Sequence, residues 1–99
     1  MKRINAVYGG YLNDVDILLV PDHIADSIEQ VVWDFNIWLS DSVNSEPFAR
    51  VDEKGRRYLD INTEEFLWWL NNVKITDDCK AQVEKQHVAF VKEYPSAEF

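Results

Sequence analysis

Little in this sequence points to disulfides, disorder or a membrane span. Its single cysteine, Cys79, excludes an internal disulfide framework and a zinc site built on cysteines. With only three glycines, three prolines and 46% apolar residues, the composition is that of a folded chain. No apolar run approaches the roughly 18 residues of a membrane helix, and no apolar signal segment follows Lys2 and Arg3. We therefore expect a soluble, cytoplasmic protein.

Positive charge is missing from the first half of the chain. Residues 4–49 hold eight carboxylates and no lysine or arginine, and the whole chain carries a net charge of −8. A field of one sign repels nucleic-acid phosphates and anionic lipid, and it attracts cationic partners. We therefore expect no direct binding to nucleic acid or membrane. Whether the charge serves a partner or only solubility depends on where the carboxylates fall.

The length of 99 residues is typical of a single domain, spanning 1–99, and the pattern along it is mixed. β-prone residues run from Ile4 to Val20, and Gly9-Gly10 favours a turn between two short strands. Pro21-Asp22 then predicts a helix start capped by the Asp side chain, and a helix of roughly twenty residues follows. Its apolar stripe, expected to face the core, comprises Ile24, Ile28, Val31, Val32, Phe35, Trp38 and Leu39.

The middle of the chain predicts a hairpin followed by a short helix. Residues 48–51 and 57–61 flank a turn that contains Gly55, which indicates two antiparallel strands. Asn62 and Glu65 resemble a capping box, so a short helix is expected to begin there.

The last quarter of the chain is ambiguous between helix and strand. From Thr76 we expect a final helix, with a strand over residues 87–91 as the alternative. The pattern acid-Phe-x-x-Trp-Leu occurs twice, at 34–39 and at 65–70. It predicts two amphipathic helices that meet in one core. Together these patterns predict an α+β fold in which a small antiparallel sheet packs against two or three amphipathic helices.

The long helix also carries apolar side chains opposite its core stripe. On a helical wheel, that side holds three carboxylates, one indole and one isoleucine: Asp22, Asp26, Glu29, Trp33 and Ile37. An aromatic anchor and an aliphatic neighbour among carboxylates are typical of a binding site for a basic protein. Trp68 repeats this arrangement on the shorter helix. The alternative is that a second element covers Trp33 and Ile37, which would leave no interface there.

No pattern of catalytic or metal-binding residues occurs in the sequence. The two histidines are 64 residues apart and form no metal-ligand spacing, so we expect no catalytic residue, metal or cofactor. His87 is expected at the edge of the core. Asp14 and Asp16 would share one face of a strand and could hold Mg²⁺. Because two carboxylates without a third ligand make a poor metal site, a solvated strand face explains them better.

Two segments of this small acidic chain carry its resemblance to a known class of protein. The helix that begins Pro21-Asp22-His23-Ile24-Ala25-Asp26-Ser27-Ile28-Glu29 and the segment Phe66-Leu67-Trp68-Trp69-Leu70-Asn71 both carry outward tryptophans. The chain resembles the bacterial immunity proteins of contact-dependent growth inhibition and related polymorphic toxin systems. The resemblance implies a protein that binds the toxin domain of a secreted effector, often a basic nuclease, and blocks its active site or substrate channel. Carboxylates would then replace phosphate against the Arg and Lys of the toxin.

The leading hypothesis is therefore stoichiometric neutralisation of one cognate protein toxin, and three other functions stay open. An acidic nucleic-acid mimic would inhibit a defence protein and would compete with DNA or RNA for several unrelated proteins. A homo-oligomeric structural protein would use its exposed tryptophans to contact a second copy. An enzyme would have to rest on Asp14 and Asp16.

Overall fold

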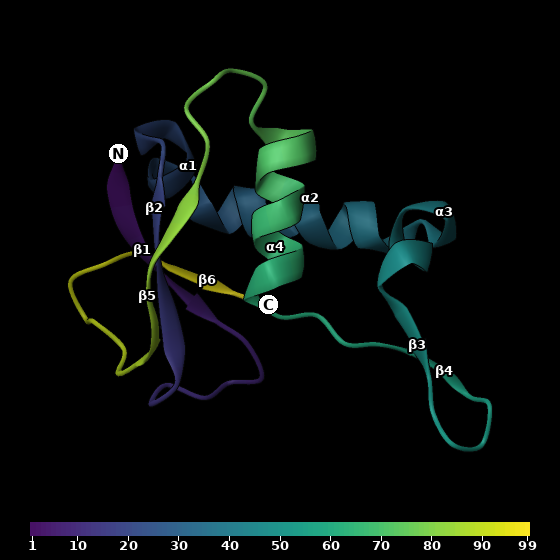
Figure 1. The fold of residues 1–99 in the computed structure, drawn as a ribbon. Coiled ribbons are helices and arrows are strands. Elements are labelled where there is room, and N and C mark those ends of the chain that lie inside the picture. The colour runs from purple at the N-terminus through teal and green to yellow at the C-terminus, as the bar shows by residue number, and fades with distance from the viewer.

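A four-stranded mixed sheet forms one side of the molecule, and helices cover one of its faces (Figure 1). The computed structural model describes all residues from Met1 to Phe99. The sheet has the order β5-β2-β1-β6 and is built from Lys2–Val7 (β1), Val15–Val20 (β2), Gln82–Val88 (β5) and Ser96–Glu98 (β6). β2 pairs antiparallel with both β1 and β5, whereas β6 pairs parallel with β1. The α+β class is confirmed, but the predicted all-antiparallel sheet is corrected to a mixed one.

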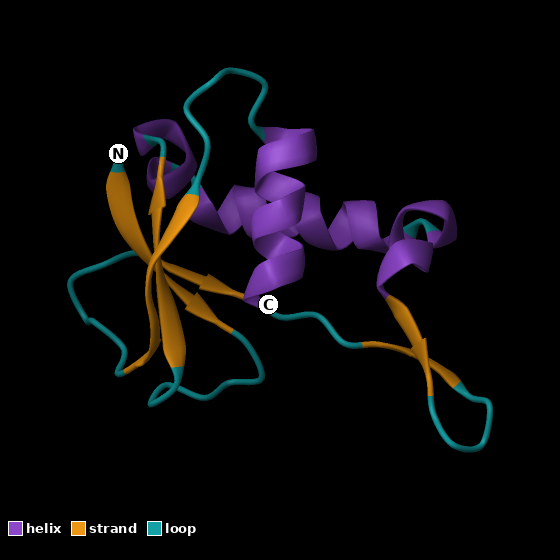
Figure 2. Ribbon diagram, viewed as in Figure 1, coloured by secondary structure: helices purple, strands orange, loops and turns teal.

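The helices and a separate hairpin lie between β2 and β5 in the chain. The helical elements are α1 (Asp22–Asp26), α2 (Ile28–Ser40), α3 (Ser42–Ser45), a 3₁₀ turn (Glu46–Phe48), α4 (Thr63–Trp69) and a π-helical segment (Leu70–Lys74). The predicted hairpin is confirmed as β3 (Ala49–Val51) and β4 (Arg57–Leu59), and it extends away from the sheet and the helices (Figure 2). None of the helices has the length and apolar character that crossing a membrane requires.

The main core lies between the helices and the face of the sheet that they cover. At its centre the ring of Phe35 on α2 lies 5.2 Å from that of Phe66 and 5.1 Å from that of Trp69, both on α4. Phe99 stacks on Phe66 at 4.7 Å. The predicted stripe is confirmed, because all seven of its side chains are buried in this core or packed against it: Ile24, Ile28, Val31, Val32, Phe35, Trp38 and Leu39. The two acid-Phe-x-x-Trp-Leu segments therefore lie on helices that meet in one core.

The opposite face of the sheet is covered by the segment that links β5 to β6. Apolar side chains of this segment and of β5 pack on those of β1 and β2 there: Val88, Phe90, Val91 and Tyr94 on Val7, Val15 and Ile17. The buried Asn5 of β1 holds the segment in place. Its Nδ2 donates to the carbonyls of Val91 (2.8 Å) and Tyr94 (3.2 Å), and its Oδ1 accepts from the Val91 N–H (3.0 Å). Since β5 and β6 both run parallel to β1, their link crosses the sheet instead of forming a hairpin.

The predicted final helix is wrong. The chain forms a loop after Lys74 and then the strand β5, Gln82–Val88, which overlaps the predicted alternative of a strand over 87–91 only at residues 87 and 88. Asp77 does not cap a helix, and its Oδ1 accepts from the Cys79 N–H at 2.8 Å within the loop. Of the apolar side chains with helical spacing in this segment, Cys79 and Val83 are exposed, whereas Phe90 and Tyr94 pack on the sheet. The segment forms a strand because its backbone pairs with the free edge of β2. Periodicity along the chain does not predict such pairing.

The two capping predictions differ in outcome. Asn62 caps α4, since its Oδ1 accepts from the Glu64 N–H at 3.0 Å. Glu65 does not return a bond to Asn62; it is buried, and this burial raises the pKa of its carboxyl. At α1, Pro21 occupies the N-cap position and no side chain caps the helix, so the prediction for Asp22 is wrong.

Candidate functional site

Trp33 and Ile37 are exposed on the outer side of α2. The exposed fraction of Trp33 is 63% and that of Ile37 is 55%. Because they are four residues apart on one helix, the two side chains stand on the same face. No second element covers them, which settles the question that the sequence left open.

A groove of about 850 Å³ lies beside Trp33. Its walls come from the junction of α1 and α2, residues 25–30, and from Pro95 before β6. The helix is interrupted at Ser27, whose hydroxyl donates to the His23 carbonyl at 2.7 Å. This interruption separates the two helices where the groove forms.

A second groove of about 520 Å³ continues the first one toward the end of the chain. Glu29 and Pro95 line both grooves, and Glu98 of β6 lines the second. The two grooves therefore form one continuous surface with the exposed side chains of α2. We call this set of residues the α2 surface: Asp26, Glu29, Trp33, Ile37, Pro95 and Glu98.

Two of the predicted carboxylates are already engaged by positive groups within the chain. The α-amino group of Met1 lies 3.0 Å from Oδ1 of Asp22, and it holds the pKa of that carboxyl below its usual range. Nζ of Lys2 lies 2.6 Å from Oδ1 of Asp26. Lys2 is the first residue of β1, which contacts α1, and Met1 directly precedes it. These two carboxylates are therefore paired, and the helix has less free negative charge than the absence of basic residues from 4–49 suggests.

Glu29 and Glu98 carry the unpaired negative charge of the α2 surface. Neither carboxylate forms a hydrogen bond or an ion pair within the chain. Asp34, farther along α2, accepts from Lys74 at 2.8 Å and from Gln30 at 2.9 Å, and these contacts lower its pKa. On the α2 surface, Glu29 in the groove beside Trp33 and Glu98 in the second groove therefore keep their negative charge free.

Trp68 is half-exposed, but the structure does not bring it to the α2 surface. Its ring packs 6.1 Å from that of Trp38 and 5.7 Å from that of Phe48. It lines a different hollow of about 360 Å³, together with Arg50 and Glu65. This hollow shares no lining residue with the grooves of the α2 surface. Of the six sequence-predicted residues, Trp68 therefore lies at a separate place, and Asp22, paired with the Met1 amino group, lines neither groove of the α2 surface.

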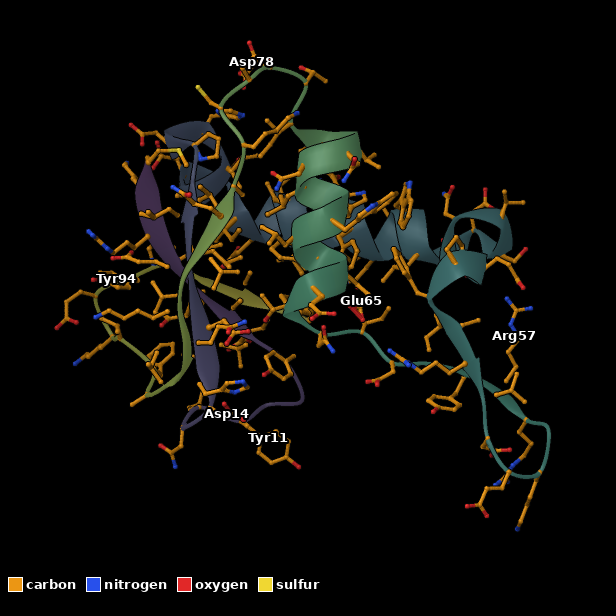
Figure 3. All side chains as sticks on the ribbon, viewed as in Figure 1. Tyr11, Asp14, Arg57, Glu65, Asp78 and Tyr94 are labelled. Atoms are coloured by element: carbon orange, nitrogen blue, oxygen red, sulfur yellow. The ribbon has the colours of Figure 1, made fainter.

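Asp14 and Asp16 both bind His87. Asp14 precedes β2 at the lower end of the sheet (Figure 3), and its Oδ1 lies 2.7 Å from Nδ1 of His87. Asp16 is buried, and its Oδ1 accepts from the His87 backbone N–H at 3.1 Å. No three His, Cys, Asp or Glu side chains gather to hold a metal ion. The side chain of His87 is 68% exposed, so its predicted place at the core edge is wrong.

Sequence reasoning missed Pro95 and Glu98 as part of the α2 surface. They lie far from α2 in the chain and reach it because β6 pairs with β1 and contacts α2. The signal that would have found them is the apolar Ala97, buried between two polar residues of a short strand.

Comparison with protein-family models, with curated proteins and with solved structures finds no match for this chain.

Proposed function

We propose that this protein binds and neutralises a basic bacterial toxin domain through its α2 surface, in the manner of the immunity proteins it resembles. The observation that carries the proposal is the exposure of Trp33 beside the unpaired Glu29. Tryptophan is enriched among the residues that dominate binding energy, and exposed apolar side chains beside a groove mark interaction sites.

Shape and charge would have separate roles in this interaction. Trp33 and Ile37 supply apolar area that a partner can remove from water, and this sets the dissociation rate. Glu29 and Glu98 attract lysine and arginine side chains over a longer range, and this sets the association rate. A nuclease toxin fits this chemistry because its substrate cleft is lined by basic residues.

The test begins with capture of a partner from the native host by the wild-type protein at about 0.15 M and about 0.5 M salt. The captured polypeptide is then purified, and its binding to the wild-type protein, Trp33→Ala and Tyr11→Ala is measured. Tyr11 is the matched control because it is 70% exposed and lies in the β1–β2 loop.

We expect one basic polypeptide whose toxic activity is abolished at a molar ratio of one to one. Trp33→Ala should dissociate about 30-fold faster, the effect of an anchor worth about 2 kcal/mol. Tyr11→Ala should match the wild type. Equal binding by Trp33→Ala, with its fold intact, rules out the α2 surface, and recovery of many nucleic-acid-binding proteins favours the nucleic-acid mimic instead.

Self-association is a second candidate function, and the hairpin favours it. β3 and β4 form a two-stranded sheet of their own, and Val51, Tyr58 and Leu59 on it are exposed. Isolated two-stranded hairpins are marginally stable, so contact with a second copy would stabilise this one. Sedimentation over a range of concentrations tests it: a monomer throughout rules this candidate out.

A further inference from the structure

A small polar cavity lies between the sheet and the start of α4, apart from the α2 surface. Its volume is about 190 Å³, below the roughly 300–1,000 Å³ of sites for drug-sized ligands. It is sized for one side chain or one small molecule. The residues that matter below come from the loop after β1, from β2, from α4 and from β5: Tyr8, Asp16, Thr63, Leu67, Val83 and His87. No lysine or arginine lines it.

Asp16 is an unusual residue for its position. It lies on the central strand β2, on the side of the sheet that faces the helices, and is only 4% exposed. The next two β2 side chains on that side, Leu18 and Val20, belong to the apolar core. The Asp16 Oδ1 accepts the His87 N–H, but no donor in the chain reaches its Oδ2. Because only one oxygen of this carboxylate has a partner in the chain, the other can accept a hydrogen bond from a positive group that enters the cavity.

A second unmet polar group stands at the same cavity. The hydroxyl of Thr63, at the first turn of α4, is buried and has no hydrogen-bond partner. Tyr8 adds a third oxygen, and burial together with Asp16 and Asp14 raises its pKa, so it is present as the neutral phenol. The cavity is thus lined by the buried carboxylate of Asp16, the exposed carboxylate of Glu64 and the hydroxyl-bearing side chains of Tyr8 and Thr63.

We propose that this cavity binds a single primary ammonium group on an aliphatic chain, with Asp16 as its counter-ion. An ammonium has three donors and no acceptor, which suits cavity walls that carry carboxylate and hydroxyl side chains and no basic group. Leu67 and Val83 supply apolar wall for the carbon chain of the ligand. The proposal does not depend on the α2 surface, because the two sites share no residue.

Two other cations fit the cavity less well. A divalent metal ion prefers several oxygen or imidazole ligands, and no group of three or more such side chains is present. A guanidinium prefers a carboxylate that is free to accept with both oxygens. At Asp16, Oδ1 is already occupied by the His87 N–H, so only one oxygen is open.

The experiment is a titration of the isotopically labelled protein with n-butylammonium, followed by NMR. Saturable shifts are expected at the amides of Tyr8, Thr63 and His87, with the weak affinity of a ligand that has few atoms. n-Butanol, which has the same shape and no charge, should shift these amides far less. Asp16→Asn should weaken binding at least tenfold, whereas the matched change Asp78→Asn, in the exposed loop before β5, should have no effect.

A further variant and a pair of peptides test the proposal independently and distinguish a small free amine from a lysine side chain of another protein. Tyr8→Phe removes only a hydroxyl and should weaken binding about threefold even where Asp16→Asn fails to fold. A capped peptide that contains one lysine, compared with the same peptide carrying acetyl-lysine, tests whether a protein side chain enters the cavity. If n-butylammonium causes shifts and the lysine peptide does not, the ligand of the cavity is a small free amine. Equal shifts with butanol and butylammonium, or none with either, overturn the proposal.

Discussion

His87 and Asp14 form a hydrogen bond of 2.7 Å between Nδ1 and Oδ1, where β5 meets the start of β2. The bond and the negative charge of Asp14 favour the protonated imidazole, so the pKa of His87 is raised above its usual value. A raised pKa in the folded state means that the folded chain binds the proton more tightly. The resulting stability is complete below the unfolded pKa of about 6.5 and is lost as pH rises through the folded pKa. Since both side chains are largely exposed, the contribution is small.

Asp14→Asn should therefore lower the pKa of His87 toward its ordinary value. The measurement is an NMR titration of the imidazole resonances in the wild type and the variant. The loss of stability in the variant should be larger at about pH 5.5 than at about pH 8.5, and the opposite order would contradict the assignment.

Glu29→Lys should slow association with the proposed toxin by about tenfold at low salt and leave dissociation nearly unchanged. Glu29 is the sharper probe than Asp26, because Asp26→Lys would also break the ion pair with Lys2. Glu53→Lys, in the turn of the hairpin, makes the same change of charge away from the α2 surface. Association rates measured against salt concentration distinguish the two. Equal slowing by both variants would show that only the net charge matters.

Phe35→Ala should lower the free energy of unfolding by about 3–5 kcal/mol. The ring is fully buried and contacts the rings of Phe66, Trp69 and Phe99, so its removal leaves a cavity where α2, α4 and the end of the chain meet. Trp33→Ala on the same helix should change stability by no more than about 0.5 kcal/mol. Urea unfolding measures both. Similar losses for the two variants would mean that Trp33 is covered in solution.

Asn5→Ala should release the segment that links β5 to β6. It removes the partners of the Val91 N–H and of the Val91 and Tyr94 carbonyls, and leaving such groups unpaired costs about 1–3 kcal/mol each. Hydrogen exchange should accelerate at the Val91 amide more than at the amides that pair β1 with β2. Asn36→Ala, at an exposed position of α2, is the control. Unchanged protection of Val91 would show that apolar packing alone holds the segment.

Local sequence patterns were sufficient to predict which side of a helix is buried, because a helix packs along its own apolar stripe. The spacing of Ile24, Val31 and Phe35 predicts the buried side of the long helix, and it thereby predicts that Trp33 and Ile37 point away. The Asn62 cap and the hairpin around Gly55 are equally local, since their hydrogen bonds join residues close in the chain.

Contacts between distant segments escaped prediction. Lys2 neutralises Asp26 because β1 contacts α1, and Glu98 joins Glu29 because β6 pairs with β1 and contacts α2. The same holds for Asp16, which the sequence suggested as a solvated residue. The approach of α4 and β5 buries it, and it lines a cavity.

The sequence by itself determined the acidic character, the α+β class and the outward face of α2, because composition and helical period are properties of the local chain. Only the tertiary structure decided that residues 82–88 form a strand, that β6 runs parallel to β1, and which carboxylates stay unpaired. These outcomes depend on backbone hydrogen bonds and ion pairs between segments far apart in sequence. No periodicity along a single segment encodes such pairings.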